Sequence, residues 1–499
     1  MADARASLDP RTPVLVGVGQ ADQRPAAVAD ALAPIDLLAE AARAAEADSG
    51  ADRLLAALDT VAVVRIHSWP YPDAAAALAS GLGAEPRRTI ATDDGGNYPQ
   101  WLLNRAAAEI ARGDADAVLI GGAECFRSQS LARREGTPPP WAHQDAGATP
   151  TIAHANPAEL WHRTEWIRQL ILPVTFFALF ESALRAHHRW TIDEHRDRIA
   201  ALWARLASGA EANPMAWDRS HHTAAEIRDP SPTNRMVSFP YTKLMNANIN
   251  VDQAAAFVVC SVERARALGV PTDRWVFPWV GADASDHWHA ATRDQLWRSP
   301  AIRLAGAAAF AEAGIGPDDL AHVDLYSCFP SAVQIAAAEL GLGLDRPLTV
   351  TGGLAFAGGP LNDYVSHSIA AMAERLRADP GSMGLVTALG GFLTKHAIGI
   401  YSTTPPPAGY RQTDVQADVD ALPSRAVLEL PDGPVAIEAS TVGHGRDGEP
   451  DRGVITALTA DGARTIATTT DPDLLALLET EETAGRAATV DADGTLHLL

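Results

Sequence analysis

Two copies of one local pattern constrain the fold of this 499-residue chain more than any other feature. In each copy a Gly-Gly pair precedes an amphipathic helix that ends at a glycine, and a buried strand then runs into a second Gly-Gly pair. The copies span residues 95–122 and 358–391. In both helices apolar residues recur at positions i, i+3, i+4 and i+7, the stripe of a helix that packs on one face. We therefore expect two related βα halves of α/β architecture, with mostly parallel, buried strands.

The rest of the chain divides around these two copies. We expect residues 1–285 to form the first half, with a Trp- and His-rich insertion at about 126–240, and residues 286–404 to form the second half. A proline-rich run at 404–409 predicts a linker. Beyond it, short apolar runs separated by Asp-Gly and Gly turns predict a small OB-like β-barrel domain at 410–499.

Composition and charge exclude several classes of function. The formal charge is −22 and the pI is about 5.1, so a nucleic-acid-binding surface is not expected. The three cysteines, Cys125, Cys260 and Cys328, include no Cys-x-x-Cys pair, which argues against a disulfide framework and a metal site. No run approaches the ~20 apolar residues of a membrane span, and residues 1–10 lack a signal-peptide pattern. We expect a protein of the reducing cytoplasm.

Four segments carry a resemblance to a known family. They are 246–256 (Asn-Ala-Asn-Ile-Asn-Val-Asp-Gln-Ala-Ala-Ala), 323–329 (Val-Asp-Leu-Tyr-Ser-Cys-Phe), and the glycine-rich 352–360 and 384–391. With these motifs the chain resembles the thiolase superfamily from about residue 14 to 403, in the branch linked to sterol carrier proteins. It is more similar still to the actinobacterial thiolase-like proteins of type 1, which add a C-terminal β domain. The resemblance implies the layered αβαβα thiolase fold and coenzyme A (CoA) or an acyl-CoA thioester as ligand.

The family's four catalytic groups are missing from this sequence. Gly96 stands where the family has its nucleophilic cysteine, and Gly359 stands where it has the histidine of a Gly-His-Pro motif. Tyr326 opens the segment that matches the family's Asn-Glu-Ala-Phe or His-Asp-Cys-Phe motif, and the second cysteine falls near Ala388 or Leu389. Because glycine carries no nucleophile, acyl transfer through residue 96 is chemically impossible. We expect neither Claisen condensation nor thiolysis.

Three side chains are candidates to replace the missing groups. Tyr326 could donate to an oxyanion or act as an acid, as its resemblance to thiolase-fold aldolases of sterol side chains implies, or it could merely pack. Cys328 could be a relocated nucleophile or an inert buried cysteine. His396 could be a base, or a structural residue where a loop meets the next strand.

Further residues are expected to contact the ligand. The resemblance places Asn248, flanked by Asn246 and Ala247, where the family has a serine that touches the pantetheine arm of CoA. An amide there could bind the ligand, or it could end the loop before the next strand. The remaining pocket candidates, which also suit turns and helix starts, are Asp94, Gly96, Asn97, Gly359, Asn362 and Tyr364.

Two classes of function remain open at this point. The chain could be an unconventional acyl-CoA enzyme, either an acyltransferase or a retro-aldol lyase that uses Tyr326 with His396. Alternatively, it could be a non-catalytic protein that binds CoA or serves as a scaffold for a protein partner. Convergence of Tyr326, Cys328 and His396 within hydrogen-bond reach would favour the enzyme.

The oligomeric state is also open. The resemblance implies dimerisation through a strand that here spans 87–92 and leads into Asp93 and Asp94. Two such acidic loops would repel each other across a two-fold axis unless they were paired. A monomer is therefore as consistent with the sequence as a homodimer.

Overall fold

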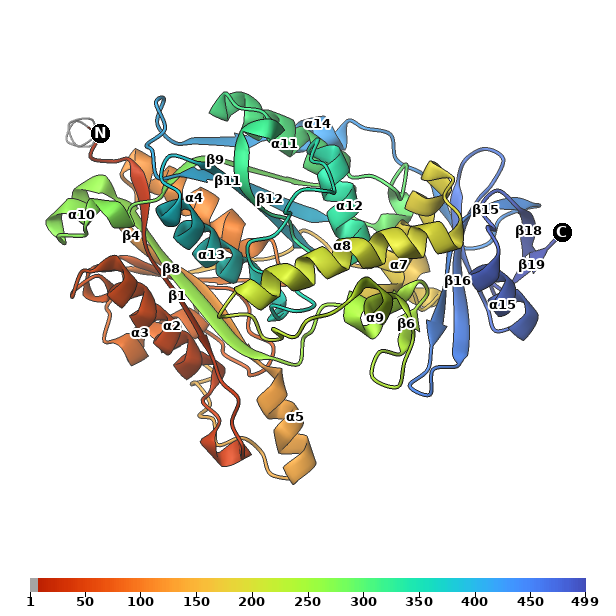
Figure 1. Ribbon diagram of the computed structural model, residues 1–499, viewed down its shortest axis with the longest axis horizontal. Helices are drawn as coiled ribbons and strands as arrows, with labels where there is room; N and C mark the ends of the chain where they lie inside the picture. Colours follow the sequence, from red (N-terminus) through yellow and green to blue (C-terminus); the bar gives the residue numbers. More distant parts are fainter. Residues whose placement is uncertain (1–7) are drawn as a thin grey trace.

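The computed structural model describes residues 8–499 and confirms the α/β fold with two related halves (Figure 1). The expectation that residues 1–10 form no signal peptide concerns a segment that lies mostly outside the described residues. The first sheet has the strand order β1-β8-β4-β2-β3-β5 and the second has the order β10-β11-β12-β9-β13. The strands of the first sheet are β1 (Pro13–Asp22), β2 (Thr60–Val63), β3 (Arg88–Thr92), β4 (Ala117–Cys125), β5 (Ile152–His154) and β8 (Asp252–Ser261). Those of the second are β9 (Phe277–Ser285), β10 (Leu320–Asp324), β11 (Met383–Gly390), β12 (Lys395–Ser402) and β13 (Arg411–Asp414).

The two sheets repeat one pairing scheme. In the first sheet β2 is parallel to β4, and β8 is antiparallel to both β4 and β1. In the second sheet β10 is parallel to β11, and β12 is antiparallel to both β11 and β9. This equivalence confirms the internal repeat that the glycine-bounded segments predict.

Five layers of secondary structure result. Helices α4 (Tyr98–Arg112) and α13 (Tyr364–Ala378), the two helices of the repeat, lie between the sheets. Their apolar stripes, including Leu103, Ile110, Ile369 and Leu376, are almost fully buried. The outer layers are α2 (Pro34–Ser49) and α3 (Ala74–Leu82) on the first sheet, and α11 (Pro300–Ala313) and α12 (Pro330–Glu339) on the second. None of the helices in residues 8–499 is long and apolar enough to cross a bilayer.

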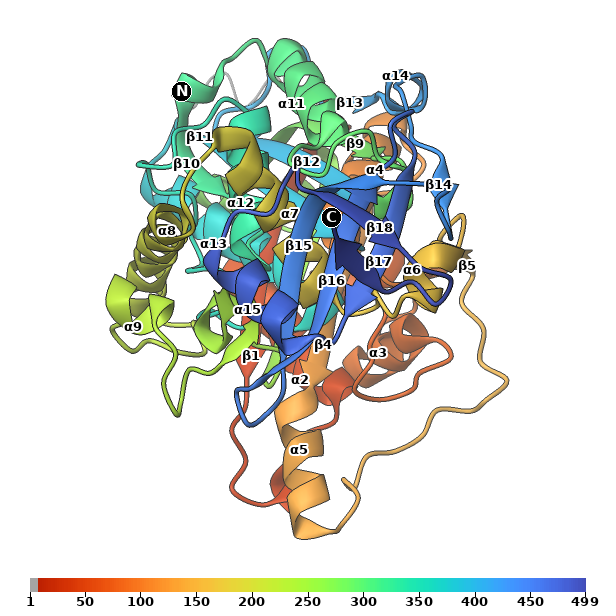
Figure 2. The same cartoon turned by 90° about the vertical axis from the view of Figure 1, so that its right-hand side faces the viewer.

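The expected insertion contributes helices that pack on the second half. It contains α5 (Phe126–Glu135), α6 (Arg163–Ile167), α7 (Pro173–His188), α8 (Ile192–Ala212), α9 (Ala224–Arg228), β6 (Met236–Ser238) and β7 (Tyr241–Thr242). Helix α5 projects from the body of the molecule (Figures 1 and 2). Glu181 of α7 pairs with His195 of α8 and accepts hydrogen bonds from Tyr241 (2.5 Å) and from Gln334 of α12 (2.6 Å). This buried network fixes the insertion to the second half.

The outer edge of β3 is paired within the chain itself. β5 runs parallel to it, with Ile90 opposite Ile152 and Thr92 opposite His154. Because the N–H and C=O groups of this edge already have partners, β3 cannot pair with a second copy while β5 is in place. Asp93 and Asp94 do not lie as unpaired charges, because Arg65 contacts them at 2.9 and 3.6 Å. The pairing of β3 with β5 opposes dimerisation through β3, whereas the Arg65 contacts remove the repulsion that the sequence predicts. The oligomeric state stays a prediction.

The strands beyond residue 414 form a third, strand-rich unit, because β13 at 411–414 still pairs with β9 of the second sheet. Its strands are β14 (Val427–Leu428), β15 (Val435–His444), β16 (Pro450–Leu458), β17 (Arg464–Thr469), β18 (Ala487–Val490) and β19 (Leu496–Leu498), with helices α14 (Gln416–Asp420) and α15 (Pro472–Thr480). They form one sheet in the order β14-β17-β16-β15-β18-β19, and β6 adds to β15 (Figure 2). A single bridge between Thr468 and Thr495 brings the β17 end of the sheet toward β19. The closed barrel therefore stays a prediction.

Arg464 attaches this unit to the second half. Its guanidinium is fully buried and bonds both carboxylate oxygens of Glu438, at 2.7 and 2.6 Å. It also donates to the carbonyl oxygens of Ala291 (2.8 Å) and Arg293 (2.5 Å), which belong to the second half.

We predict that Arg464→Met destabilises the protein by about 3–5 kcal/mol, because it leaves Glu438 as an uncompensated buried charge. Adding Glu438→Gln should recover part of this loss. Equilibrium urea unfolding measures both effects. Arg486→Met, which removes an exposed pair with Glu481, is the matched control and should cost at most ~1 kcal/mol. Equal losses for the two arginine variants would contradict the anchoring role.

Candidate functional site

The hydroxyl of Tyr326 fills the place where a side chain on Gly96 would stand. A Cβ built on Gly96 would lie 2.3 Å from Tyr326 Oη and 2.7 Å from the backbone oxygen of Leu389. Both distances are far inside van der Waals contact, so only glycine fits at position 96 beside this tyrosine. The glycine and the tyrosine, which lie far apart in the chain, are therefore sterically matched.

Little space remains around this contact. The cavity that Tyr326 lines has a volume of only about 10 Å³, which is room for one water molecule at most. The Tyr326 side chain is buried, and burial raises the pKa of its phenol well above the ordinary value. The phenol therefore stays protonated, and it can donate a hydrogen bond but does not act as a base near neutral pH.

His396 is held by buried partners in the second half. Its Nε2 lies 3.3 Å from a carboxylate oxygen of Asp286 and 3.4 Å from the hydroxyl of Ser299, which caps α11. Burial alone would raise the pKa of Asp286, but its hydrogen bond with His396 holds that pKa below the ordinary value. His396 lines the small cavity with Tyr326, yet no hydrogen bond within residues 8–499 joins the two side chains. The geometry fits the structural interpretation of His396 better than a catalytic one.

Cys328 does not join this pair. It is buried and free, as are Cys125 and Cys260, and burial raises the pKa of its thiol. A thiol that stays protonated is a poor nucleophile. Of the three candidates, only Tyr326 and His396 line the same cavity, and no hydrogen bond joins them within residues 8–499. The catalytic assignments therefore stay predictions.

The segment expected to contact pantetheine packs against the glycine loop at 352–360. The backbone N–H of Asn248 donates to Leu354 (3.0 Å), and its carbonyl accepts from the N–H of Gly359 (2.9 Å). The Asn248 side chain accepts from the N–H of Asn250 in its own turn. Ala247 lies beside Gly359, and the Asn246 amide donates to the carbonyl of Thr242. These contacts favour a loop-ordering role for Asn246 and Asn248, and ligand contact here stays a prediction.

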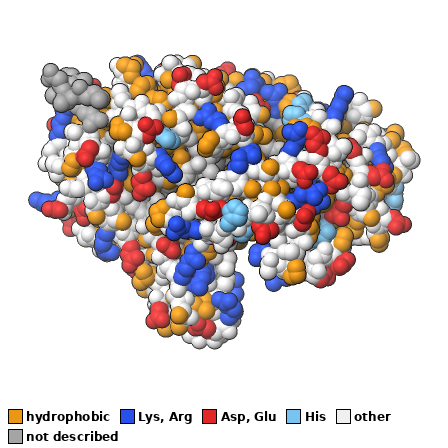
Figure 3. Space-filling view, viewed as in Figure 1, with side chains coloured by type: hydrophobic (Ala, Val, Ile, Leu, Met, Phe, Trp, Pro, Cys, Tyr) orange, Lys and Arg blue, Asp and Glu red, His pale blue; other side chains and the backbone are white. Residues whose placement is uncertain are grey.

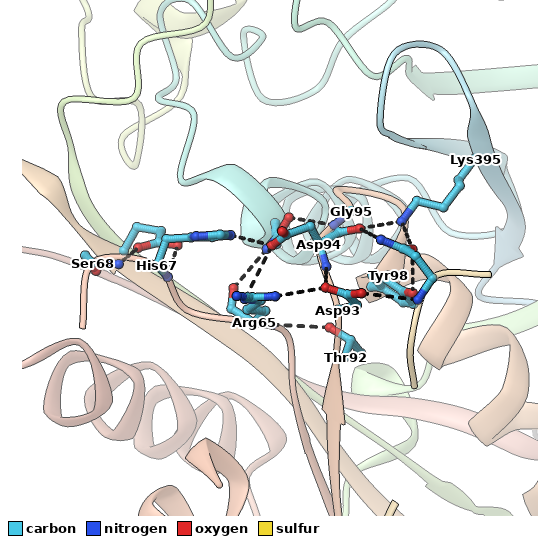
Figure 4. Close-up of polar contacts among 12 residues, drawn as sticks. Arg65, His67, Ser68, Thr92, Asp93, Asp94, Gly95, Tyr98 and Lys395 are labelled. Carbon is cyan, nitrogen blue, oxygen red and sulfur yellow. Dashed lines mark hydrogen bonds and ion pairs between the residues drawn. The ribbon is translucent and has the colours of Figure 1, made fainter. Parts of the chain in front are cut away.

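Four of the other pocket candidates, Asp94, Gly96, Asn97 and Asn362, meet around Gly95. Figure 4 shows Asp94 and Gly95 among their polar contacts. The amide of Asn362 accepts from the N–H of Gly95 (2.8 Å) and donates to the carbonyl of Arg65 (3.0 Å), so it joins the glycine loops of the two halves. Asp94 bonds His67 at 2.5 Å, and that hydrogen bond raises the pKa of His67. Tyr364 instead bonds Thr351 (2.6 Å) in the buried interior.

Lys395 is a functional candidate that sequence reasoning missed. Its ammonium end donates to the backbone oxygen of Asp94 and to the amide oxygen of Asn156 (2.7 Å), and it lies 4.6 Å from the centre of the Tyr98 ring (Figure 4). Burial lowers the pKa of this amine to about 8, although Asp93 and Asp94 act in the opposite direction. The sequence does contain one indication of Lys395: it is one of only two lysines in the chain, and it directly precedes the candidate His396.

A basic cavity is the second feature that the sequence does not reveal. It has a volume of about 590 Å³ and lies between α8, β10 and the segment 345–350. Its basic side chains are Arg205, His322, Arg346 and Arg375, against one acidic residue, Asp345. Leu206, which also lines it, contacts the Gly353 loop next to Ser327. On the face drawn in Figure 3 acidic and basic side chains are interspersed, so the net charge of −22 coexists with a local basic site.

Comparisons with known proteins agree with the fold and the added unit. Residues 414–495 match the family model described as the thiolase-like protein type 1 additional C-terminal domain. A monomeric SCP2-thiolase-like protein type 1 from Mycobacterium smegmatis is 34% identical, with 99% of this chain and 100% of that chain covered and a TM-score of 0.84.

Two aldolases are more distant. The steroid side-chain-cleaving aldolase of Thermomonospora curvata is 26% identical over 368 residues, which is 70% of this chain and 86% of that protein. The structure of an Ltp2–ChsH2(DUF35) aldolase is 21% identical, with 79% and 98% of the two chains covered and a TM-score of 0.59. At that identity the second likeness concerns the fold alone.

The contact between Gly96 and Tyr326 generates a direct prediction. Gly96→Ala should destabilise the protein by about 1–3 kcal/mol, because its Cβ overlaps the phenol. In a Tyr326→Leu background the same change should cost less. Urea unfolding of the four proteins in this cycle gives the coupling.

Gly359→Ala is the matched control, because a Cβ there meets its nearest atoms at 3.4 Å, an ordinary contact. It should change stability by less than about 1 kcal/mol. Equal costs for Gly96→Ala in both backgrounds would show that the phenol does not occupy this place.

Proposed function

Because the chain belongs to the SCP2-thiolase-like proteins of type 1, we propose that it binds CoA or an acyl-CoA thioester and performs no acyl transfer through a cysteine. The observation that carries this proposal is the phenol of Tyr326 against Gly96, in the place of a thiolase nucleophile. Neither a thiolate nor an acyl group attached to one could be accommodated there. The buried, protonated state of the three cysteines also supports this view.

The basic cavity is our proposed site for the phosphate end of CoA. CoA carries several phosphate groups, and the planar guanidinium of arginine suits them because it donates two parallel hydrogen bonds. Within residues 8–499, Arg205, Arg346 and Arg375 form no close salt bridge. Arg205 and Arg346 donate to backbone carbonyl groups. Leu206 lines the cavity and also contacts the Gly353 loop beside Ser327, so the cavity is close to the segment that begins with Tyr326. We further propose a monomer, because β5 covers the edge of β3. We also propose a cytoplasmic location, because the three cysteines are free, which suits a reducing compartment.

A retro-aldol carbon–carbon lyase is the second candidate. The buried, protonated phenol of Tyr326 favours it, since such a group can donate to a developing oxyanion. The likeness to a steroid side-chain-cleaving aldolase points the same way. Another aldolase of this fold is named as a complex with a DUF35 protein. If this chain is a lyase, we therefore propose that it acts together with a protein partner.

Calorimetric titration of the full-length protein with CoA and with acyl-CoAs tests the proposed function. We expect saturable binding that Arg375→Gln weakens by about tenfold, because a charged hydrogen bond to phosphate is lost. Arg134→Gln removes an exposed arginine at the end of α5 and serves as the matched control, with unchanged affinity. Absence of binding to the wild-type protein would refute the proposal, and equal affinities for all three proteins would refute the proposed phosphate site.

Mass spectrometry of the same mixtures decides between the two candidates. The lead proposal expects no new acyl product, and in particular no condensation or thiolysis. Carbon–carbon cleavage that Tyr326→Phe abolishes while CoA affinity is retained would establish the lyase. If the Tyr326→Phe variant still cleaves the carbon–carbon bond, the phenol is not the group that donates to the oxyanion.

A further inference from the structure

We propose that Lys395 is a reactive amine in a second pocket, where it takes a small aldehyde or ketone as a Schiff base. The pocket has a volume of about 230 Å³ and is formed by the first turn of α4, the segment after β5, and the adjoining ends of β9 and β12. Trp101 and Trp288 are its large apolar side chains. It shares one lining residue, His396, with the small cavity beside Tyr326. This proposal does not depend on CoA binding.

The hydrogen bonds of Lys395 match a neutral amine. Its Nζ has two oxygen partners within residues 8–499, the carbonyl of Asp94 and the amide oxygen of Asn156. A neutral amine has two N–H groups and one lone pair, so both hydrogens are used and the lone pair is left for an electrophile. An ammonium group would have a third N–H with no oxygen acceptor among the described residues, and a remaining neighbour would be the Tyr98 ring, whose centre lies 4.6 Å from Nζ. The side chain is 5% exposed, so water satisfies little of this need.

The surroundings of Lys395 raise the fraction of neutral amine near physiological pH, although the ammonium form still predominates below pH 8. Burial lowers its pKa to about 8, and Asp93 and Asp94 only partly oppose this effect. About half of the amine is therefore unprotonated at pH 8, compared with a small fraction for an ordinary lysine. Lysines that form Schiff bases in enzymes are activated in this way.

Two other groups of the pocket fit the chemistry. Asp283 lies on the same face of the sheet as Lys395, because Lys395 pairs with Ser285 and Asp283 pairs with Ala397 in the β9–β12 ladder. Burial raises the pKa of Asp283, which shifts this carboxyl group toward its protonated form. Asn97 also lines the pocket, and its side-chain oxygen is buried without a hydrogen-bond partner. It supplies an acceptor for a hydroxyl group formed there.

The proposed step is balanced without a co-reactant. The Nζ lone pair forms a bond to the carbonyl carbon as the C=O π bond breaks, and one of the two N–H protons passes to the carbonyl oxygen to give a neutral carbinolamine. The C–O bond then breaks as Asp283 donates a proton to the departing hydroxyl, which leaves as water. The nitrogen loses its remaining N–H proton as the imine forms, and that proton returns to the carboxylate.

The scarcity of lysine in the chain supports this inference. Among 40 lysines and arginines only two are lysines, Lys243 and Lys395. Arginine stays protonated in proteins and cannot form this imine. Lys243 is exposed at the surface and provides an internal reference amine.

Reductive trapping tests the proposal on the wild-type, full-length protein. Incubation with propanal and sodium cyanoborohydride, followed by peptide mass spectrometry, reports the labelling of each amine separately, including the N-terminal one. We expect Lys395 to be labelled at least tenfold faster than Lys243 at pH 7.5. The Lys395 rate should rise with pH and level off above about 8, because the neutral amine is the nucleophile. Labelling of Lys395 no faster than that of Lys243 would overturn the proposal.

Variants separate reactivity from structure. Lys395→Arg should lose the fast label while Lys243→Arg keeps it. Asp283→Asn leaves the amine in place and should slow the trapping of Lys395 severalfold if the carboxyl group assists loss of water. Fast labelling of Lys395 by propanal in a urea-unfolded sample, equal to that of the folded protein, would also contradict a built site.

Discussion

The contact between the phenol of Tyr326 and the backbone of Gly96 is the constraint on which the rest of the site depends. One partner follows a strand of the second half and the other precedes a central helix of the first half, so the contact lies where the halves meet. The phenol occupies the space of the missing side chain, and the remaining cavity of about 10 Å³ holds at most one water molecule. The thiolase fold is thus retained, and the position at which the resemblance places the nucleophile is closed by a bulky side chain.

The glycine loops around this contact are tied together by hydrogen bonds rather than left open. Asn362 reaches from the second half to Gly95 in the first, and Asn248 pairs through its backbone with the loop that contains Gly359. Lys395 holds the same first-half loop from the opposite strand. Hydrogen bonds of this kind between the two halves make the loops rigid. The two larger cavities lie beside this closed centre, which is why we place ligand chemistry there.

The sequence predicted features that arise from local patterns and missed those that arise from tertiary contact. The repeat of helix, strand and Gly-Gly pair can be predicted because its periodicity is local, and Gly96 shows directly that no cysteine stands at that position. Strand β5 cannot be predicted in this way, because its three residues form a strand only through pairing with β3. The fit of Tyr326 to Gly96 and the low pKa of Lys395 depend on neighbours that are remote in the chain. Periodicity carries no signal for such contacts.

A pair of crystal structures, one of the free protein and one with CoA bound, tests the central claim most directly. The account predicts that the Tyr326 hydroxyl lies against Gly96 in both, and that the pantetheine thiol stops short of this contact. Rotation of the Tyr326 side chain away from Gly96 on CoA binding, opening a cavity that reaches the helix start, would contradict it.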